Sequence, residues 1–87
     1  MGLTVKRFTA SWCGPCRTLA PIMERVASTS PGVRFEIIDV DDQPAIARKY
    51  GVRSVPTVVF ERDGIEVRRE LGVQSESAFK SIINEHK

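Results

Sequence analysis

Two cysteines separated by two residues stand near the start of the chain, in the run Trp-Cys-Gly-Pro-Cys that ends at Cys16. Such a pair can bind a metal ion, form a structural disulfide or act as a reversible redox couple. A structural zinc site normally takes four nitrogen or sulfur ligands, whereas this chain has only these two cysteines and one histidine, His86. A structural bridge would close too short a loop to remove much chain entropy. The residue types therefore favour a redox dithiol.

The spacing of the two cysteines suits the first turn of a helix. Residues three apart there lie within the Cα separation of about 4.4–6.8 Å that a disulfide tolerates. Gly14 lets the backbone bend, and Pro15 fits a first turn, where its missing N–H is not needed. Cys13 is expected to be exposed at the helix N-terminus, where unpaired N–H groups and the helix dipole favour a thiolate near neutral pH. Cys16 would be more buried, so we predict that Cys13 attacks a partner disulfide and Cys16 resolves the mixed disulfide.

Length and composition limit the alternatives. The 87 residues suffice for one domain, residues 1–87. A net charge of +2 is too small to indicate a nucleic-acid-binding protein. The first residues lack the apolar segment of a signal peptide, and no run approaches the roughly 18 apolar residues that span a bilayer. Two cysteines in such a chain favour a reducing compartment, so we expect a cytoplasmic protein without membrane or nucleic-acid partners.

The hydrophobic pattern predicts the elements that must position the cysteines. Strands are expected at 3–9, 33–40, 57–61 and 65–71, and helices at 15–28, at 45–50 and after Ser75, which caps the last one. Pro21 should interrupt and kink the first helix. The strand at 33–40 is expected at the centre of the sheet, because its apolar content rises toward its end. Asp63 and Gly64 predict a hairpin turn. The result is an α/β fold of order βαβαββα, with a four-stranded mixed sheet and three helices.

The cysteine run after the first strand, together with the run Val-Pro-Thr that ends at Thr57, resembles the thioredoxin family. The hairpin turn at Gly64, followed eight residues later by Gly72, adds to this resemblance, which extends from Val5 over nearly the whole chain. Glutaredoxins share the fold, but they usually carry a different cysteine pair and a late double-glycine motif. Neither occurs here, so the chain is similar to a minimal, N-terminally shortened thioredoxin.

The resemblance implies a site and a set of partners. The Val55–Pro56 bond should be cis and face the cysteines, with the backbone of Val55 offered to an extended substrate peptide. Trp12 would form an apolar rim rather than a core residue, and the other rim residues would be Gly14, Pro15, Gly72 and Val73. No cofactor or metal is expected. A thioredoxin reductase would recharge the dithiol with electrons from NADPH, the substrates would be disulfide-containing proteins, and the protein would act as a monomer.

The chain departs from the family pattern in three places. The strand and helix that usually precede the first strand have no counterpart ahead of it. Arg7 stands where the family usually has a buried aspartate credited with helping to deprotonate the resolving cysteine, and Ile37 stands where a lysine is frequent. Arg7 alternates with apolar residues on its strand, and a buried guanidinium needs a partner. Asp39 is the candidate partner, unless Arg7 reaches the surface instead.

Several functions remain open on these residues. A general protein-disulfide reductase is the leading hypothesis, and a glutaredoxin-like or dedicated donor, for example to ribonucleotide reductase, is a second. A binding module with incidental thiols is a third, although an intact dithiol argues against it. Arg17 and Arg53 flank the predicted site, where they either only solubilise the protein or help to hold a thiolate and favour acidic partner surfaces.

Overall fold

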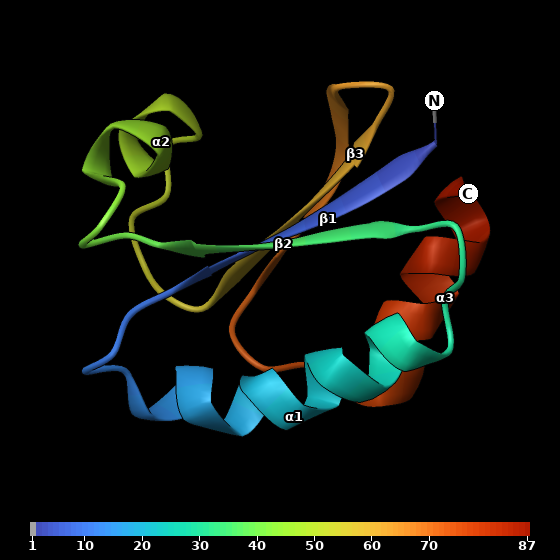
Figure 1. The fold of residues 1–87 in the computed structure, drawn as a ribbon, viewed down its shortest axis with the longest axis horizontal. Helices are drawn as coiled ribbons and strands as arrows, with labels where there is room; N and C mark the ends of the chain where they lie inside the picture. Colours follow the sequence, from blue (N-terminus) through green and yellow to red (C-terminus); the bar gives the residue numbers. More distant parts are fainter. Residues whose placement is uncertain (1) are drawn as a thin grey trace.

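The computed structural model describes residues 2–87 and has the predicted order of elements (Figure 1). These elements are β1 (Leu3–Thr9), α1 (Gly14–Ser28), β2 (Arg34–Asp39), α2 (Pro44–Lys49), β3 (Thr57–Arg62), β4 (Ile65–Leu71) and α3 (Glu76–His86). The expected interruption at Pro21 does not occur, since α1 continues through it. Burial of Leu19, Met23 and Val26 along one face supports the helix across the lost hydrogen bond. None of the helices within residues 2–87 has the length and apolar run that a membrane crossing needs.

The four strands form one mixed sheet in the order β2-β1-β3-β4. β1 runs parallel to β2 and antiparallel to β3, and β3 pairs antiparallel with β4. The predicted hairpin turn is confirmed, because Asp63 and Gly64 both have positive φ, 52° and 83°. The prediction that residues 33–40 form a central strand is wrong. β2 lies at an edge, where Ile37 is 63% exposed. The inner strands are β1 and β3, and residues 57–61 of β3 are all buried.

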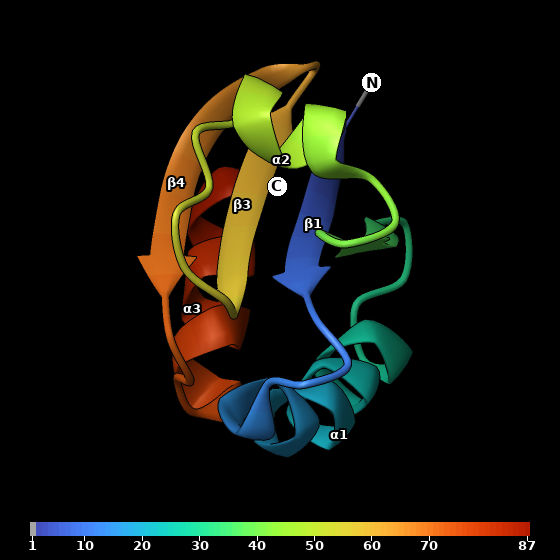
Figure 2. The same cartoon turned by 90° about the vertical axis from the view of Figure 1, so that its left-hand side faces the viewer.

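The helices cover both faces of the sheet (Figures 1 and 2). On one face, α1 and α3 enclose the larger hydrophobic core with β1 and β3, and α2 covers a smaller core on the other face. The larger core consists of Leu3, Val5, Leu19, Met23, Val26, Val58, Phe60, Phe79, Ile82 and Ile83. The smaller core is built around Phe8, Ile38 and Val59. Ser75 caps α3 as predicted, with its hydroxyl accepting the N–H of Ala78 at 3.1 Å.

A polar cluster lies beneath α2, on the smaller-core face. The Nζ of Lys6 donates to the hydroxyl of Tyr50 at 2.6 Å and lies 3.0 Å from a carboxylate oxygen of Glu61. The Tyr50 hydroxyl in turn donates to Glu61 at 2.6 Å. Desolvation lowers the pKa of Lys6, but its bonds to Tyr50 and Glu61 outweigh that effect and raise the pKa overall. All three side chains therefore satisfy one another.

Candidate active site

The two cysteines form a disulfide at the start of α1. Their Cα atoms are 5.3 Å apart, within the range expected from the first-turn spacing. Cys13 is the N-cap residue of α1, and its Sγ accepts the backbone N–H of Cys16 at 3.1 Å. In the reduced protein, this N–H and the positive end of the helix dipole would stabilise negative charge on the Cys13 sulfur.

Both cysteines are buried in the disulfide form. Cys13 is 4% exposed and Cys16 is 3% exposed, so the expectation that Cys13 is exposed is wrong for the oxidised protein. The disulfide holds both residues in a small apolar cluster with Ala10, against which Val40 and Val55 pack. Little of either cysteine is therefore open to solvent in this form.

The loop before β3 borders the Cys13 sulfur. The Val55–Pro56 bond is cis, as the resemblance implied. The carbonyl oxygen of Val55 lies 3.6 Å from the Sγ of Cys13, which has no proton to donate in the disulfide. The carbonyl of Pro56 accepts the N–H of Gly72 at 2.9 Å. This bond ties the residue after β4 to the loop that contains Val55.

A shallow groove of about 150 Å³ lies beside this loop. Its lining residues are Trp12, Val40, Val52, Arg53, Ser54 and Val55. Trp12 is 66% exposed, which makes it a surface residue and not part of the core. Its indole N–H donates to the carboxylate of Asp41 at 2.8 Å, and this bond sets the orientation of the ring. Sequence reasoning gave Asp41 no role at the site and so missed this contact.

The remaining predicted rim residues differ in their exposure. Gly14 and Pro15 are exposed at the start of α1, Gly72 is half-buried and Val73 is 37% exposed. Sequence reasoning missed Leu71, which is 62% exposed and pairs with Thr57, the residue after the cis-proline. Counting the strand register outward from the hairpin turn would have paired Thr57 with Glu70 instead, because the register shifts by one residue between Phe60 and Glu61.

The three arginines near the site differ in their surroundings. Arg17 is exposed and donates to the carbonyl of Ser11 at 2.8 Å, and the exposed Arg53 lines the groove. Arg7 is only 8% exposed, so it does not reach the surface. Its expected pairing with Asp39 is not formed. The carboxylate of Asp39 instead accepts the backbone N–H groups of residues 41 and 42.

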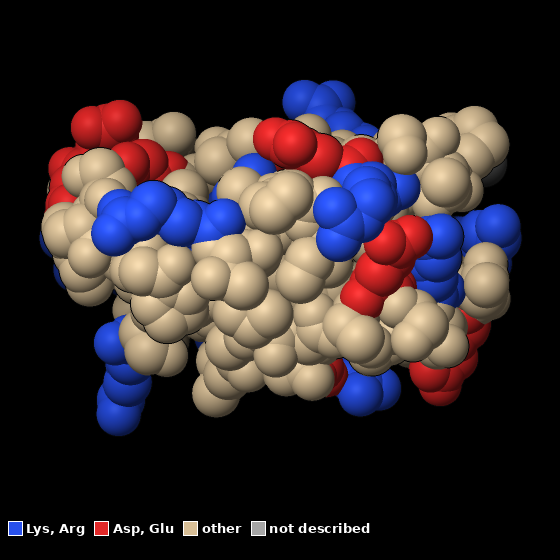
Figure 3. Space-filling view, turned by 90° about the horizontal axis from the view of Figure 1, so that it is seen from below, with Lys and Arg blue, Asp and Glu red and all other residues tan. Residues whose placement is uncertain are grey.

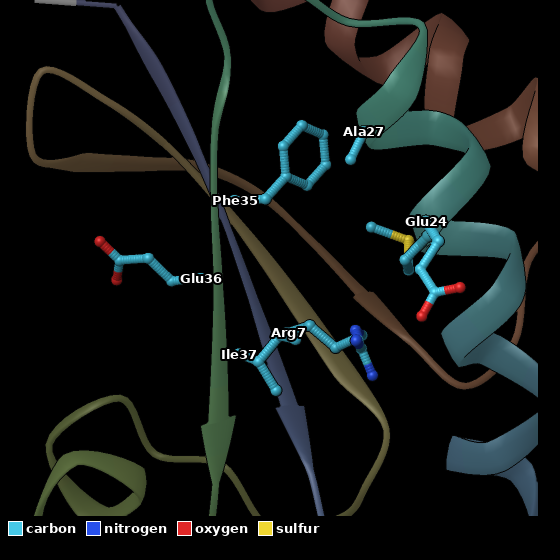
Figure 4. A pocket seen from close by; sticks show the side chains of 7 residues that line it. Arg7, Glu24, Ala27, Phe35, Glu36 and Ile37 are labelled. Carbon is cyan, nitrogen blue, oxygen red and sulfur yellow. The ribbon is translucent and has the colours of Figure 1, made fainter.

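The charge that acts on Arg7 most directly comes from Glu24 on α1 (Figure 4). Desolvation lowers the pKa of Arg7, and the carboxylate of Glu24 offsets only part of this effect. Residues 2–87 contain no group of three or more histidine, cysteine, aspartate or glutamate side chains that could hold a metal ion.

Comparison with known proteins agrees with this geometry. The model of the thioredoxin family matches residues 2–85. A thioredoxin from Chlamydia caviae is 39% identical over 85 residues, which cover 98% of this chain and 83% of the relative. A thioredoxin H-type 1 from Nicotiana tabacum is 43% identical over 81 residues, covering 93% of this chain and 64% of the relative.

Solved structures give the same result for the fold. The thioredoxin of Fasciola hepatica superposes with a TM-score of 0.92 at 44% identity, covering 99% of this chain and 82% of that one. A variant thioredoxin from Halobacterium salinarum gives a TM-score of 0.91 at 40% identity, covering 97% of this chain and 74% of that one. With its paired cysteines at the start of α1 beside a cis-proline loop, the chain belongs to the thioredoxin family of thiol–disulfide oxidoreductases.

Proposed function

We propose that this protein reduces disulfides in other proteins, with Cys13 as the attacking and Cys16 as the resolving cysteine. The observation that carries the proposal is the position of the disulfide. Cys13 caps α1 and accepts the N–H of Cys16, and the backbone of Val55 lies beside its sulfur. The helix terminus favours the thiolate on Cys13, whereas Cys16 lies one turn inside the helix, where its N–H already serves Cys13.

The reaction takes place in two exchange steps. The thiolate of Cys13 attacks one sulfur of the partner disulfide, so a mixed disulfide forms and the other partner sulfur leaves as a thiolate that takes up a proton. Cys16 then loses its proton and attacks the Sγ of Cys13. The Cys13–Cys16 bond forms, the mixed disulfide breaks and the second partner sulfur leaves. Two electrons and two protons have passed from the dithiol to the partner.

The substrate would dock across the rim that surrounds the sulfur atoms. An extended peptide lying along the Val55 backbone would bring its own sulfur beside Cys13, because the Val55 carbonyl already contacts this atom. The groove beside Trp12 offers apolar contact area, and Arg53 at its edge would favour acidic substrates. The proposed contact residues are Trp12, Gly14, Pro15, Val55, Pro56, Gly72 and Val73.

The proposal extends to the partners and the setting of the reaction. A thioredoxin reductase supplied by NADPH would return the dithiol to its reduced form, and residues 1–87 would act as one domain and as a monomer in the cytoplasm. We expect no nucleic-acid partner, because the net charge is only +2 and basic and acidic side chains are interspersed on the face shown in Figure 3.

Two cysteine variants test the roles of the sulfur atoms. Cys16→Ser should accumulate a mixed disulfide with a partner protein through Cys13, because the second exchange step is removed. Cys13→Ser should form none, although it retains one thiol and serves as the matched control. Mass spectrometry of the trapped complex identifies the linked cysteine, and trapping through Cys16 would reverse the assignment.

Reduction of insulin disulfides distinguishes the candidate functions. A general reductase should be turned over by thioredoxin reductase and NADPH, whereas a glutaredoxin-like donor should be turned over by glutathione. A binding module should reduce insulin with neither. We expect activity with the reductase system and little with glutathione alone.

A further inference from the structure

Arg7 is a buried cation that has no role in the two exchange steps proposed above. It lies on the face of β1 that Leu3 and Val5 share, and its side chain projects toward α1 (Figure 4). It is 8% exposed, and no hydrogen bond or ion pair joins its side chain to any residue in the described part of the chain. A guanidinium so placed has lost most of its hydration without gaining an acceptor in exchange.

Lys6, the adjacent residue on β1, is a cation that has hydrogen-bond and ion-pair partners. Lys6 points to the opposite face of the sheet and is held by Tyr50 and Glu61 at 2.6 and 3.0 Å. These bonds overcome desolvation and raise the pKa of Lys6, whereas desolvation dominates at Arg7 and lowers its pKa. The structure therefore accounts for Lys6 in the disulfide form, but it leaves Arg7 without a close counter-charge.

Two cavities meet at Arg7. One, of about 110 Å³, lies between α1 and β2 and is lined by Met23, Glu24 and Phe35 among others. The other, of about 230 Å³, is lined by Arg7 together with Cys16, Ala20 and Asp39. No fully buried side-chain nitrogen in residues 2–87 lacks a hydrogen-bond partner, so the Arg7 nitrogens are not fully enclosed, and Arg7 lines both cavities. Arg7 and the resolving cysteine thus border one solvent-accessible space.

The sulfur of Cys16 would be stabilised as a thiolate by a positive charge that borders the same cavity. This sulfur must carry negative charge when it attacks Cys13, yet the amide at the helix terminus that could stabilise an anion points to the Cys13 sulfur. Arg17 is exposed, and its guanidinium bonds to the Ser11 carbonyl outside the helix. Of the basic residues lining the cavity that contains Cys16, Arg7 is the one that is buried.

We propose that Arg7 is the counter-charge for the Cys16 thiolate in the second exchange step. This inference rests on the roles proposed above for Cys13 and Cys16. The proton of Cys16 leaves through the shared cavity to solvent, past Asp39, while the guanidinium stabilises the sulfur anion. The thiolate attacks the Sγ of Cys13, the Cys13–Cys16 bond forms, and the partner sulfur leaves with the electron pair of the broken mixed disulfide. Arg7 acts through its charge and stays protonated throughout.

Ellman's reagent separates the two steps in one experiment. It is a small disulfide that releases one coloured thionitrobenzoate when Cys13 attacks and a second when Cys16 resolves the mixed disulfide. Arg7→Met removes the charge and keeps an aliphatic side chain, and Arg7→Lys keeps a charge. We expect Arg7→Met to release the second thionitrobenzoate about tenfold more slowly at neutral pH, the low end of what a nearby opposite charge does for an ionising group. The first release should be nearly unchanged, and Arg7→Lys should recover most of the second.

The pH profile separates a loss of charge from a loss of shape. The deficit of Arg7→Met should vanish at alkaline pH, where Cys16 ionises without help. The charged groups lining the two cavities are Arg7, Arg17, Glu24, Glu36 and Asp39. These groups are the same in Arg7→Met and Arg7→Lys, so a deficit that lysine removes at neutral pH and that disappears in alkali belongs to the charge at position 7. Replacement of a desolvated cation by an apolar chain usually leaves a fold intact, so Arg7→Met is expected to fold.

Lys6→Met is the matched control, because it removes a cation from the adjacent residue on the face away from this cavity. It should leave both releases unchanged. Native rates for Arg7→Met would overturn the proposal, as would equal slowing in Arg7→Met and Arg7→Lys at every pH. These outcomes are distinct from failure of the proposed function, in which the native protein would not reduce insulin and Cys16→Ser would trap no partner.

Discussion

Glu61→Gln is expected to destabilise the fold by about 2–3 kcal/mol, because it removes the anion from the cluster beneath α2. The Glu61 side chain is 9% exposed, pairs with Lys6 at 3.0 Å and accepts from Tyr50 at 2.6 Å. Removal of one partner from a buried ion pair costs about 3–5 kcal/mol. Lys6 is 18% exposed and retains Tyr50 and a longer contact of 4.0 Å to Glu36, which reduces the expected cost. A domain of 87 residues has about 4–13 kcal/mol of stability in total, so the loss should be large in proportion.

Urea unfolding of a double-mutant cycle measures this interaction. The cycle comprises the native protein, Glu61→Gln, Lys6→Met and the double variant, and we expect a coupling free energy of at least about 1 kcal/mol. The raised pKa of Lys6 gives the sign of the pH dependence. The stabilisation from protonated Lys6 should be fully present below the ordinary lysine pKa of 10.5 and should be lost as the pH rises through the higher folded value. A coupling energy near zero would refute the view that the cluster stabilises the fold.

Three further predictions concern other residues. Asp41→Ala should raise the KM for insulin reduction about fivefold, because the hydrogen bond that holds the Trp12 ring is lost and one such bond has about this value. Asp42→Ala is the control, and equal KM values for the two variants would contradict the prediction. Ser75→Ala should lower the unfolding free energy in urea by about 1 kcal/mol through loss of the α3 cap, whereas the exposed Ser81→Ala should change it little. The hydrogen bond from Arg69 holds the pKa of Glu66 below 4.5. Glu66→Gln should therefore lower the free energy of unfolding by at most about 0.5 kcal/mol at neutral pH, and this difference should disappear as the pH falls through the folded pKa of Glu66. A difference that persists in acid would contradict this assignment.

The sequence was sufficient to predict the elements and the cysteine geometry, because both depend on local chemistry. Apolar periodicity predicted the helices, and the Asp63–Gly64 turn follows from the positive φ angles that these residues tolerate. The Cα separation of the cysteines follows from helix geometry alone. The cis bond at Pro56 came from the family resemblance, since a lone X–Pro bond is rarely cis.

The features that were missed depend on contacts between distant segments. The place of β2 at the sheet edge is set by which strands β1 pairs with, and the apolar content of β2 does not contain that information. Exposure of Cys13 was overestimated, because Val40 and Val55, which pack over the cysteines, come from later parts of the chain. The cluster of Lys6, Tyr50 and Glu61 joins three elements and has no local pattern.

The burial of both sulfur atoms has a consequence for selectivity among reductants. Thiol–disulfide exchange requires access to a sulfur atom as well as a reactive attacking thiol. Cys13 and Cys16 are only 4% and 3% exposed in the disulfide form, so a small thiol that does not bind to the protein has little access to them. A protein that docks on the rim near Trp12 is held beside the sulfur long enough to react. The redox state of the pair should therefore follow the supply of docking partners and be kinetically insulated from the concentration of small thiols around it.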